Sequence, residues 1–124
     1  MNEPLALLLY EKLLPGSQLL HKLQDLGYRV QPVPAAADFV ATAEREKPLV
    51  AFVDLEPRPD TASAAIAALL AHPPTAHVPV IAFAAARNEA AQAAGRQAGA
   101  KLVVPDHALL THLNQFLDQA LALE

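Results

Sequence analysis

Apolar and polar residues alternate in blocks along the chain, and each block has the length of one strand or one helix. Three short apolar runs, at residues 5–10, 49–54 and 78–83, are typical of strands that are buried on both faces. Two further segments, at residues 28–33 and 101–104, include polar residues and have the length of short strands. This pattern predicts five strands of a sheet that is covered by helices on both sides.

The segments between these strands have apolar residues at helical spacing and are predicted to be helices. Pro or Gly residues lie at their ends, where helices commonly start or stop. The first helix is expected to start near Pro15 and to stop at Gly27. The others are expected over residues 35–46, 61–71, 87–98 and 107–123, with Asp60 or Thr61 and then Asp106 as caps. Five strand–helix units with right-handed connections predict a doubly wound α/β sandwich that forms one domain over residues 1–124.

Composition and charge narrow the classes of function. The formal net charge is −4, and no basic run is present, which argues against nucleic-acid binding. The absence of cysteine excludes a disulfide framework, a cysteine zinc site and a thiol nucleophile. The apolar runs are shorter than the roughly 18 residues of a membrane span, and no basic region precedes the first one. We therefore expect a cytoplasmic protein with neither a membrane segment nor a signal peptide.

The strand ends show no enzyme motif. Residues 10–17 follow the first strand with one Gly and one hydroxyl, and they include an acidic residue near their start. A dinucleotide or phosphate loop needs more glycines and backbone donors there. No pair of histidines has a metal-binding spacing, and no serine stands in a nucleophile context. The sequence predicts that the protein is not an enzyme.

Asp54 is the residue that calls for an explanation. It closes a strand that is otherwise apolar, at the edge of a parallel sheet where ligands usually bind. A carboxylate at this place can take part in ligand chemistry, or it can only cap the following loop. Local pattern leaves both interpretations open.

The spacing of several motifs resembles that of the receiver domain of bacterial two-component response regulators. Glu11 lies 16 residues before Gly27 in a Leu-Gly-Tyr motif, and Asp54 follows Leu-Val-Ala-Phe-Val. The run Val-Pro-Val-Ile-Ala-Phe at 78–83 and the Ala-Gly-Ala turn at 98–100 also match. The resemblance implies a CheY-like, flavodoxin-like sheet of order 2-1-3-4-5 and makes Asp54 the phosphoacceptor. It also implies a magnesium ion beside Asp54.

Most of the other residues that serve phosphorylation in this family are missing. Tyr10 replaces the first acid of the metal-binding pair, so that Glu11 and Asp54 remain as ligands for weak Mg²⁺ binding at most. Ala84 stands where the family has a residue with a hydroxyl group. The position of the family's lysine is occupied by Asp106, or by Pro105 if the alignment is shifted by one residue. Val103 stands where the family has an aromatic residue whose movement is coupled to that hydroxyl. Lys101 lies at the start of the fifth strand, at the end of the sheet opposite Asp54, and so does not replace the missing lysine.

These departures predict a degenerate receiver that needs no cofactor and acts through protein contacts. Two alternatives remain. One is a receiver that is still phosphorylated on Asp54, with magnesium held by Glu11 and Asp54. The other is a flavodoxin-like domain of unrelated function, a class that includes enzymes. A cofactor bound to the purified protein would point to this alternative.

The last two predicted helices and the fifth strand are the expected contact surface for a protein partner or a second copy. Leu113, Leu117 and Leu121 form the inward stripe of the last helix, so Leu109 and Phe116 are expected to point outward. The polar rim is expected to come from the preceding helix, and the surface comprises Asn88, Gln92, Arg96, Val103, Leu109 and Phe116. The alternative is that Leu109 and Phe116 fold back on their own helix.

Overall fold

Five parallel strands form one sheet in the order β2-β1-β3-β4-β5, as the sequence predicts. The computed structural model describes residues 4–10, 13–33, 35–56 and 58–121, and for residues 13–17 and 59 it describes the backbone alone. The strands are β1 (Leu5–Leu9), β2 (Arg29–Val33), β3 (Val50–Asp54), β4 (Val80–Ala84) and β5 (Leu102–Pro105). The order places β1 and β3 in the centre of the sheet and β5 at one edge.

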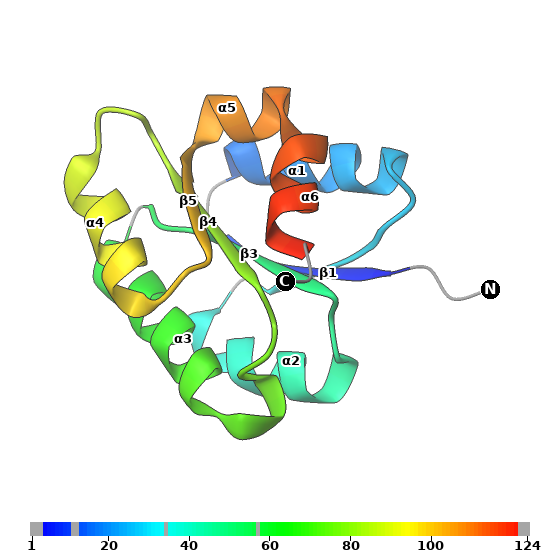
Figure 1. Cartoon of the computed structure of the whole chain (residues 1–124), viewed down its shortest axis with the longest axis vertical. Coiled ribbons are helices and arrows are strands. Elements are labelled where there is room, and N and C mark those ends of the chain that lie inside the picture. The colour runs from blue at the N-terminus through cyan, green and yellow to red at the C-terminus, as the bar shows by residue number, and fades with distance from the viewer. Residues whose placement is uncertain (1–3, 11–12, 34, 57, 122–124) are drawn as a thin grey trace.

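Helices lie on both faces of this sheet (Figure 1). One face is covered by α2 (Phe39–Glu46), α3 (Pro59–Ala71) and α4 (Glu89–Ala98), and the other by α1 (Leu13–Asp25), α5 (Asp106–Thr111) and α6 (Leu113–Leu121). Two short 3₁₀ turns, η1 (Ala36–Asp38) and η2 (Pro73–Thr75), precede α2 and follow α3. None of the helices in the described ranges is long and apolar enough to cross a membrane.

Two hydrophobic cores result from the alternation of side chains along each strand. Leu7 and Leu9 of β1 point toward α2, α3 and α4, whereas Ala6 and Leu8 point toward α1, α5 and α6. The same alternation holds in β3, where Phe52 joins the second core and Val53 the first. Because both faces are covered, all five residues of β3 are buried. The continuous apolar runs in the sequence have this origin.

The last helix differs from its prediction. A single helix over residues 107–123 is wrong, because the chain breaks at His112 into α5 and α6. His112 has φ −120° and ψ 34°, outside the helical region, and so turns the second helix relative to the first. The break separates the helix that carries Leu109 from the helix that carries Leu113 and Phe116, and Leu109 and Leu113 contribute to the same core.

Other helix starts also differ from the predictions, and α3 begins at Pro59, two residues before its predicted start. The segment predicted as one helix over residues 35–46 begins as η1 and becomes α-helical only at Phe39. The helix predicted from residue 87 begins at Glu89, and Asn88 is its N-cap residue. The predicted caps Asp60, Thr61 and Asp106 are wrong, because α3 and α5 have Arg58 and Pro105 at their N-cap positions.

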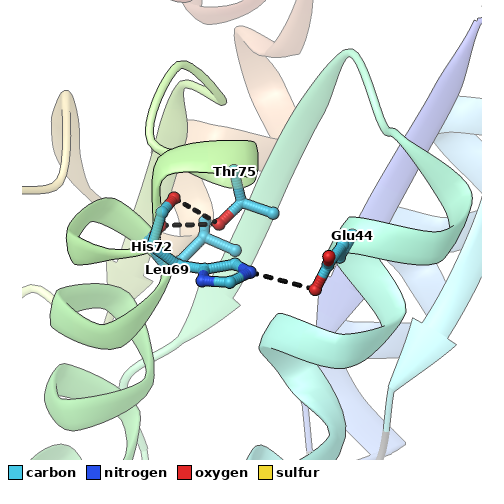
Figure 2. Close-up of polar contacts among 4 residues, drawn as sticks. All are labelled: Glu44, Leu69, His72 and Thr75. Atoms are coloured by element: carbon cyan, nitrogen blue, oxygen red, sulfur yellow. Dashed lines mark hydrogen bonds and ion pairs between the residues drawn. The ribbon is translucent and has the colours of Figure 1, made fainter.

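The carboxyl end of α3 is closed by side-chain hydrogen bonds, which Figure 2 shows. Pro73 and Pro74 cannot continue the helix, and the buried Thr75 hydroxyl donates to the carbonyl oxygens of Leu69 at 2.7 Å and His72 at 3.2 Å. His72 Nε2 lies 2.9 Å from Glu44 Oε1 of α2. These contacts satisfy carbonyls that the helix end exposes, and they tie α3 to its neighbour.

Candidate functional site

Asp54 is the last residue of β3 and lies at the carboxyl edge of the sheet. Only 5% of its surface is exposed, although the residues that follow it form a loop. Its Oδ1 atom accepts a hydrogen bond of 3.0 Å from the backbone N–H of Glu56. The strand therefore holds the carboxylate in place, and the loop folds back to bind it.

The strand register brings the predicted site positions to the same edge. Leu9 pairs with Val53, so Tyr10 leaves the sheet beside Asp54, and both line one small pocket. On the other side, Asp54 pairs with Phe83, and Ala84 pairs with Pro105. Asp106 follows directly as the first residue of α5. The structure thus gathers Tyr10, Asp54, Ala84, Pro105 and Asp106 at one edge.

The chemistry that these positions offer is limited. Ala84 is 1% exposed, and its methyl group can donate no hydrogen bond to an anion near Asp54. Lys101 lies at the opposite edge, where its backbone N–H bonds the Val80 carbonyl at the start of β4. Its side chain lines a groove there with Lys47 and Leu49. This lysine therefore belongs to the amino edge of the sheet, as the sequence predicts.

A metal site is not evident in the described part of the chain. Glu11, the second predicted ligand, lies outside the described residues. Among the residues that are described, no three His, Asp or Glu side chains gather as metal ligands. Asp54 can supply one hard oxygen ligand, and Tyr10 does not replace a carboxylate at the first-acid position.

Arg58 is a site residue that the sequence reasoning missed. It lies in the loop four residues after Asp54, is exposed, and lines the same small pocket as Asp54, Tyr10 and Thr61. A basic residue four positions after the strand-end carboxylate was the available signal.

A second missed feature connects the Asp54 loop to α4. Glu56 Oε2 accepts a hydrogen bond of 2.6 Å from Asn88 Nδ2, across 32 residues of sequence. Asn88 Oδ1 in turn accepts from the Ala91 N–H at 3.1 Å and so caps α4. An Asn before Glu-Ala-Ala is a typical N-cap, but its bond to Glu56 has no signal in the local sequence.

The predicted contact surface requires one correction. Leu109 does not point outward, because it is only 1% exposed and belongs to the core beneath α5 and α6. The outward prediction is wrong because Leu109 lies four residues before the buried Leu113, and side chains four residues apart share one face of a helix. Phe116 is half-buried and packs at the margin of the same core.

The remaining surface positions lie around the edge strand β5. Val103 is half-buried and packs against the core on the α4 side, and Arg96 is exposed on α4. Gln92 does not project freely, because its Nε2 donates to the carbonyls of Ala85 at 3.0 Å and Ala86 at 3.3 Å. Its side chain instead holds the loop before α4.

Comparison with solved structures connects this fold to receiver domains. A response regulator from Chloroflexus aurantiacus superposes with a TM-score of 0.88 at 18% identity, over 98% of this chain and 100% of the other. The receiver domain of a Pseudomonas aeruginosa PAO1 sensor histidine kinase, with magnesium coordinated in its active-site cleft, gives 0.81 at 22% identity, over 97% and 98%.

The chemotaxis protein CheY4 of Vibrio cholerae gives a TM-score of 0.82 at 17% identity, over 96% of this chain and 99% of the other. No protein-family model matches the sequence, and no curated protein matches it. The similarity is therefore one of fold: the chain has the CheY-like, flavodoxin-like fold of response-regulator receiver domains.

Proposed function

We propose that the chain is a receiver domain of bacterial two-component signalling that acts in the cytoplasm as a protein-interaction module. It works without productive phosphorylation of Asp54. The fold and the buried carboxylate at the end of β3 support the receiver assignment. The proposed role is the binding of a protein partner, with no catalytic turnover.

The main support for the proposed loss of phosphorylation is the pairing of Ala84 with Pro105 beside Asp54. The family places a hydroxyl and then an ammonium at this corner of the sheet, where they stabilise the transferring phosphoryl group. Here the corner holds a methyl group and a proline ring, and the carboxylate of Asp106 follows. Removal of one fixed donor from a developing anion typically costs about 2.7–4 kcal/mol of transition-state stabilisation.

A magnesium ion would supply charge neutralisation at the carboxylate if it bound. Within the described residues, Asp54 is the carboxylate that is placed to hold it, and Tyr10 is a poor ligand beside it. We therefore assign at most weak metal binding, with Glu11 as the expected second ligand, and the proposed interaction role requires no cofactor.

The test is a two-dimensional NMR titration with magnesium and then beryllofluoride, combined with labelling by acetyl phosphate. We expect shifts confined to the Asp54 edge in millimolar magnesium, no beryllofluoride complex and no stoichiometric phosphorylation. Asp54→Asn is the control for any labelling that occurs. Rapid labelling of the native chain that disappears in Asp54→Asn would contradict the proposal.

The second candidate is a receiver that is phosphorylated on Asp54. Its support is Arg58, which brings a guanidinium to the pocket of Asp54 and can pair with a phosphoryl oxygen. If this candidate holds, the native chain is labelled by acetyl phosphate and Arg58→Ala reduces the rate strongly. The same labelling experiment therefore separates the two candidates.

The proposed contact surface is the β5 edge of the sheet, with α4 on one side and α6 on the other. Arg96 is its exposed cation, and Val103 and Phe116 are its half-buried apolar residues. Edge strands and half-exposed apolar side chains are common features of interaction surfaces. Leu109 is excluded from this surface because it is buried.

Self-association of the purified chain tests the surface. Phe116→Asp and Arg96→Glu should each weaken a homodimer in sedimentation experiments, and Asp54→Asn should not. Lys22→Glu, an equal charge reversal on the exposed side of α1, is the matched control. If only Asp54→Asn changes the association, the surface assignment is wrong.

A further inference from the structure

Glu56 bonds to Asp54 with its backbone and to α4 with its side chain. The backbone N–H of Glu56 donates to Asp54 Oδ1 at 3.0 Å, and its Oε2 accepts from Asn88 Nδ2 at 2.6 Å. The second bond involves a carboxylate and is short, which is typical of charge-assisted hydrogen bonds. One residue therefore joins the strand-end carboxylate to the loop before α4.

Asn88 extends this series of hydrogen bonds to the first turn of α4. Its Nδ2 atom is bonded to Glu56, and its Oδ1 atom accepts from the Ala91 N–H at 3.1 Å. An N-cap side chain satisfies a backbone donor that otherwise has no partner within the helix. A displacement of Glu56 therefore changes the orientation of the group that caps the helix.

The other contacts at this corner keep the loop in one arrangement. Gln92 Nε2 donates to the carbonyls of Ala85 and Ala86, which lie in the same loop as Asn88. Leu55, between Asp54 and Glu56, is fully buried, and its backbone N–H bonds the Phe83 carbonyl. The loop after β3 and the loop after β4 thus form one hydrogen-bonded unit.

We propose that Glu56 and Asn88 are positioning residues that couple the carboxylate of Asp54 to the N-terminus of α4. The coupling consists of three successive hydrogen bonds, from Glu56 to Asp54, from Asn88 to Glu56 and from Ala91 to Asn88. It requires neither a hydroxyl at position 84 nor an aromatic residue at position 103. It rests on the proposed function only in that α4 borders the interaction surface. The bonds themselves are measurable whether or not Asp54 is phosphorylated.

Hydrogen exchange of the Ala91 N–H in the whole chain tests the coupling, because this group donates to Asn88. Asn88→Ala should raise its exchange rate about fivefold, the typical effect of losing an N-cap. Asp54→Ala removes the acceptor for the Glu56 N–H and should also raise the rate, by less than Asn88→Ala does. Asp54→Asn keeps an acceptor oxygen and should raise it less than Asp54→Ala does.

The decisive measurement is the effect of Asp54→Ala in two backgrounds. In Glu56→Ala, which lacks the side-chain acceptor, Asp54→Ala should produce no further change at Ala91. In Glu56→Gln, which keeps an acceptor oxygen, the effect should return. The amide of Ala51 in the buried strand β3, which bonds the Pro79 carbonyl, is the reference for global stability, and Asn114→Ala is the matched control.

Three results would overturn the proposal. The first is an Asp54→Ala effect of equal size with and without the Glu56 side chain. The second is an equal change at the Ala91 and Ala51 amides, which reports global destabilisation. The third is an unchanged Ala91 amide in Asp54→Ala. Since none of these depends on phosphoryl labelling, failure here is distinguishable from failure of the proposed function.

Discussion

Gly95 of α4 faces Leu55, the residue directly after Asp54. A β-carbon at Gly95 would lie 3.0 Å from Leu55 Cδ1 and 3.4 Å from Val103 Cγ2. Leu55 is fully buried, so its side chain has little room to move away. The missing side chain at Gly95 therefore lets α4 pack closely on the end of β3 and on the edge strand β5.

Gly95→Ala is expected to lower the free energy of unfolding by about 1 kcal/mol, because crowding of a packed core costs about 1–3 kcal/mol. The higher helix propensity of Ala offsets up to about 1 kcal/mol of that cost. Urea denaturation measures the difference. Gln97→Ala, at an exposed position of the same helix, should cause no loss, and a more stable Gly95→Ala variant would show that Leu55 yields easily.

Thr75→Val is expected to lower the free energy of unfolding by about 1–3 kcal/mol. Valine keeps the shape of the side chain but leaves the buried Leu69 carbonyl without the hydroxyl donor at 2.7 Å. Thr111→Val is the matched control, because the Thr111 hydroxyl donates to the His107 carbonyl on an exposed face of α5. Equal effects of the two substitutions would contradict the role assigned to Thr75.

Tyr28 should make stability depend on pH in the alkaline range. Burial raises the pKa of its phenol above the usual 10.0, and the nearby carboxylate of Asp118 raises it further. The folded state therefore holds the phenolic proton more tightly than the unfolded state. This contribution is complete below about pH 10 and is lost as the pH rises through the pKa of the folded state.

The free energy of unfolding of the native chain should accordingly fall more steeply above about pH 10 than that of Tyr28→Phe. Urea denaturation at a series of alkaline pH values gives both curves. Asp118→Asn should reduce the difference, and Tyr10→Phe should leave it in place. Parallel curves for the native chain and Tyr28→Phe would show that burial does not perturb this tyrosine.

Restoring the missing groups should restore phosphorylation in part. Ala84→Ser supplies a hydroxyl and Asp106→Lys an ammonium at the corner beside Asp54. Each donor typically contributes a factor of about 10²–10³, so the double variant should be labelled by acetyl phosphate at least about tenfold faster than the native chain. Asp54→Asn in the double variant should abolish the labelling. An unchanged rate would mean that other groups limit the reaction.

The architecture was predictable from the sequence because it depends on local patterns. Continuous apolar runs mark strands that helices cover on both faces, and all residues of β1, β3 and β4 are indeed buried. The position of Asp54 at the end of such a run placed it at the functional edge of a parallel sheet. The identity of the residues at the neighbouring strand ends, Ala84 above all, followed from the same spacing.

Only the tertiary structure decided how particular side chains are used. Helical periodicity assumes an unbroken helix and does not show the break at His112. The burial of Leu109 agrees with its spacing of four residues from Leu113, so the prediction of an outward Leu109 is wrong. The bond between Glu56 and Asn88 joins residues 32 positions apart, and no local pattern encodes such a pair. Local sequence determines which face of an element is apolar, whereas contacts between loops depend on how the packed elements bring their ends together.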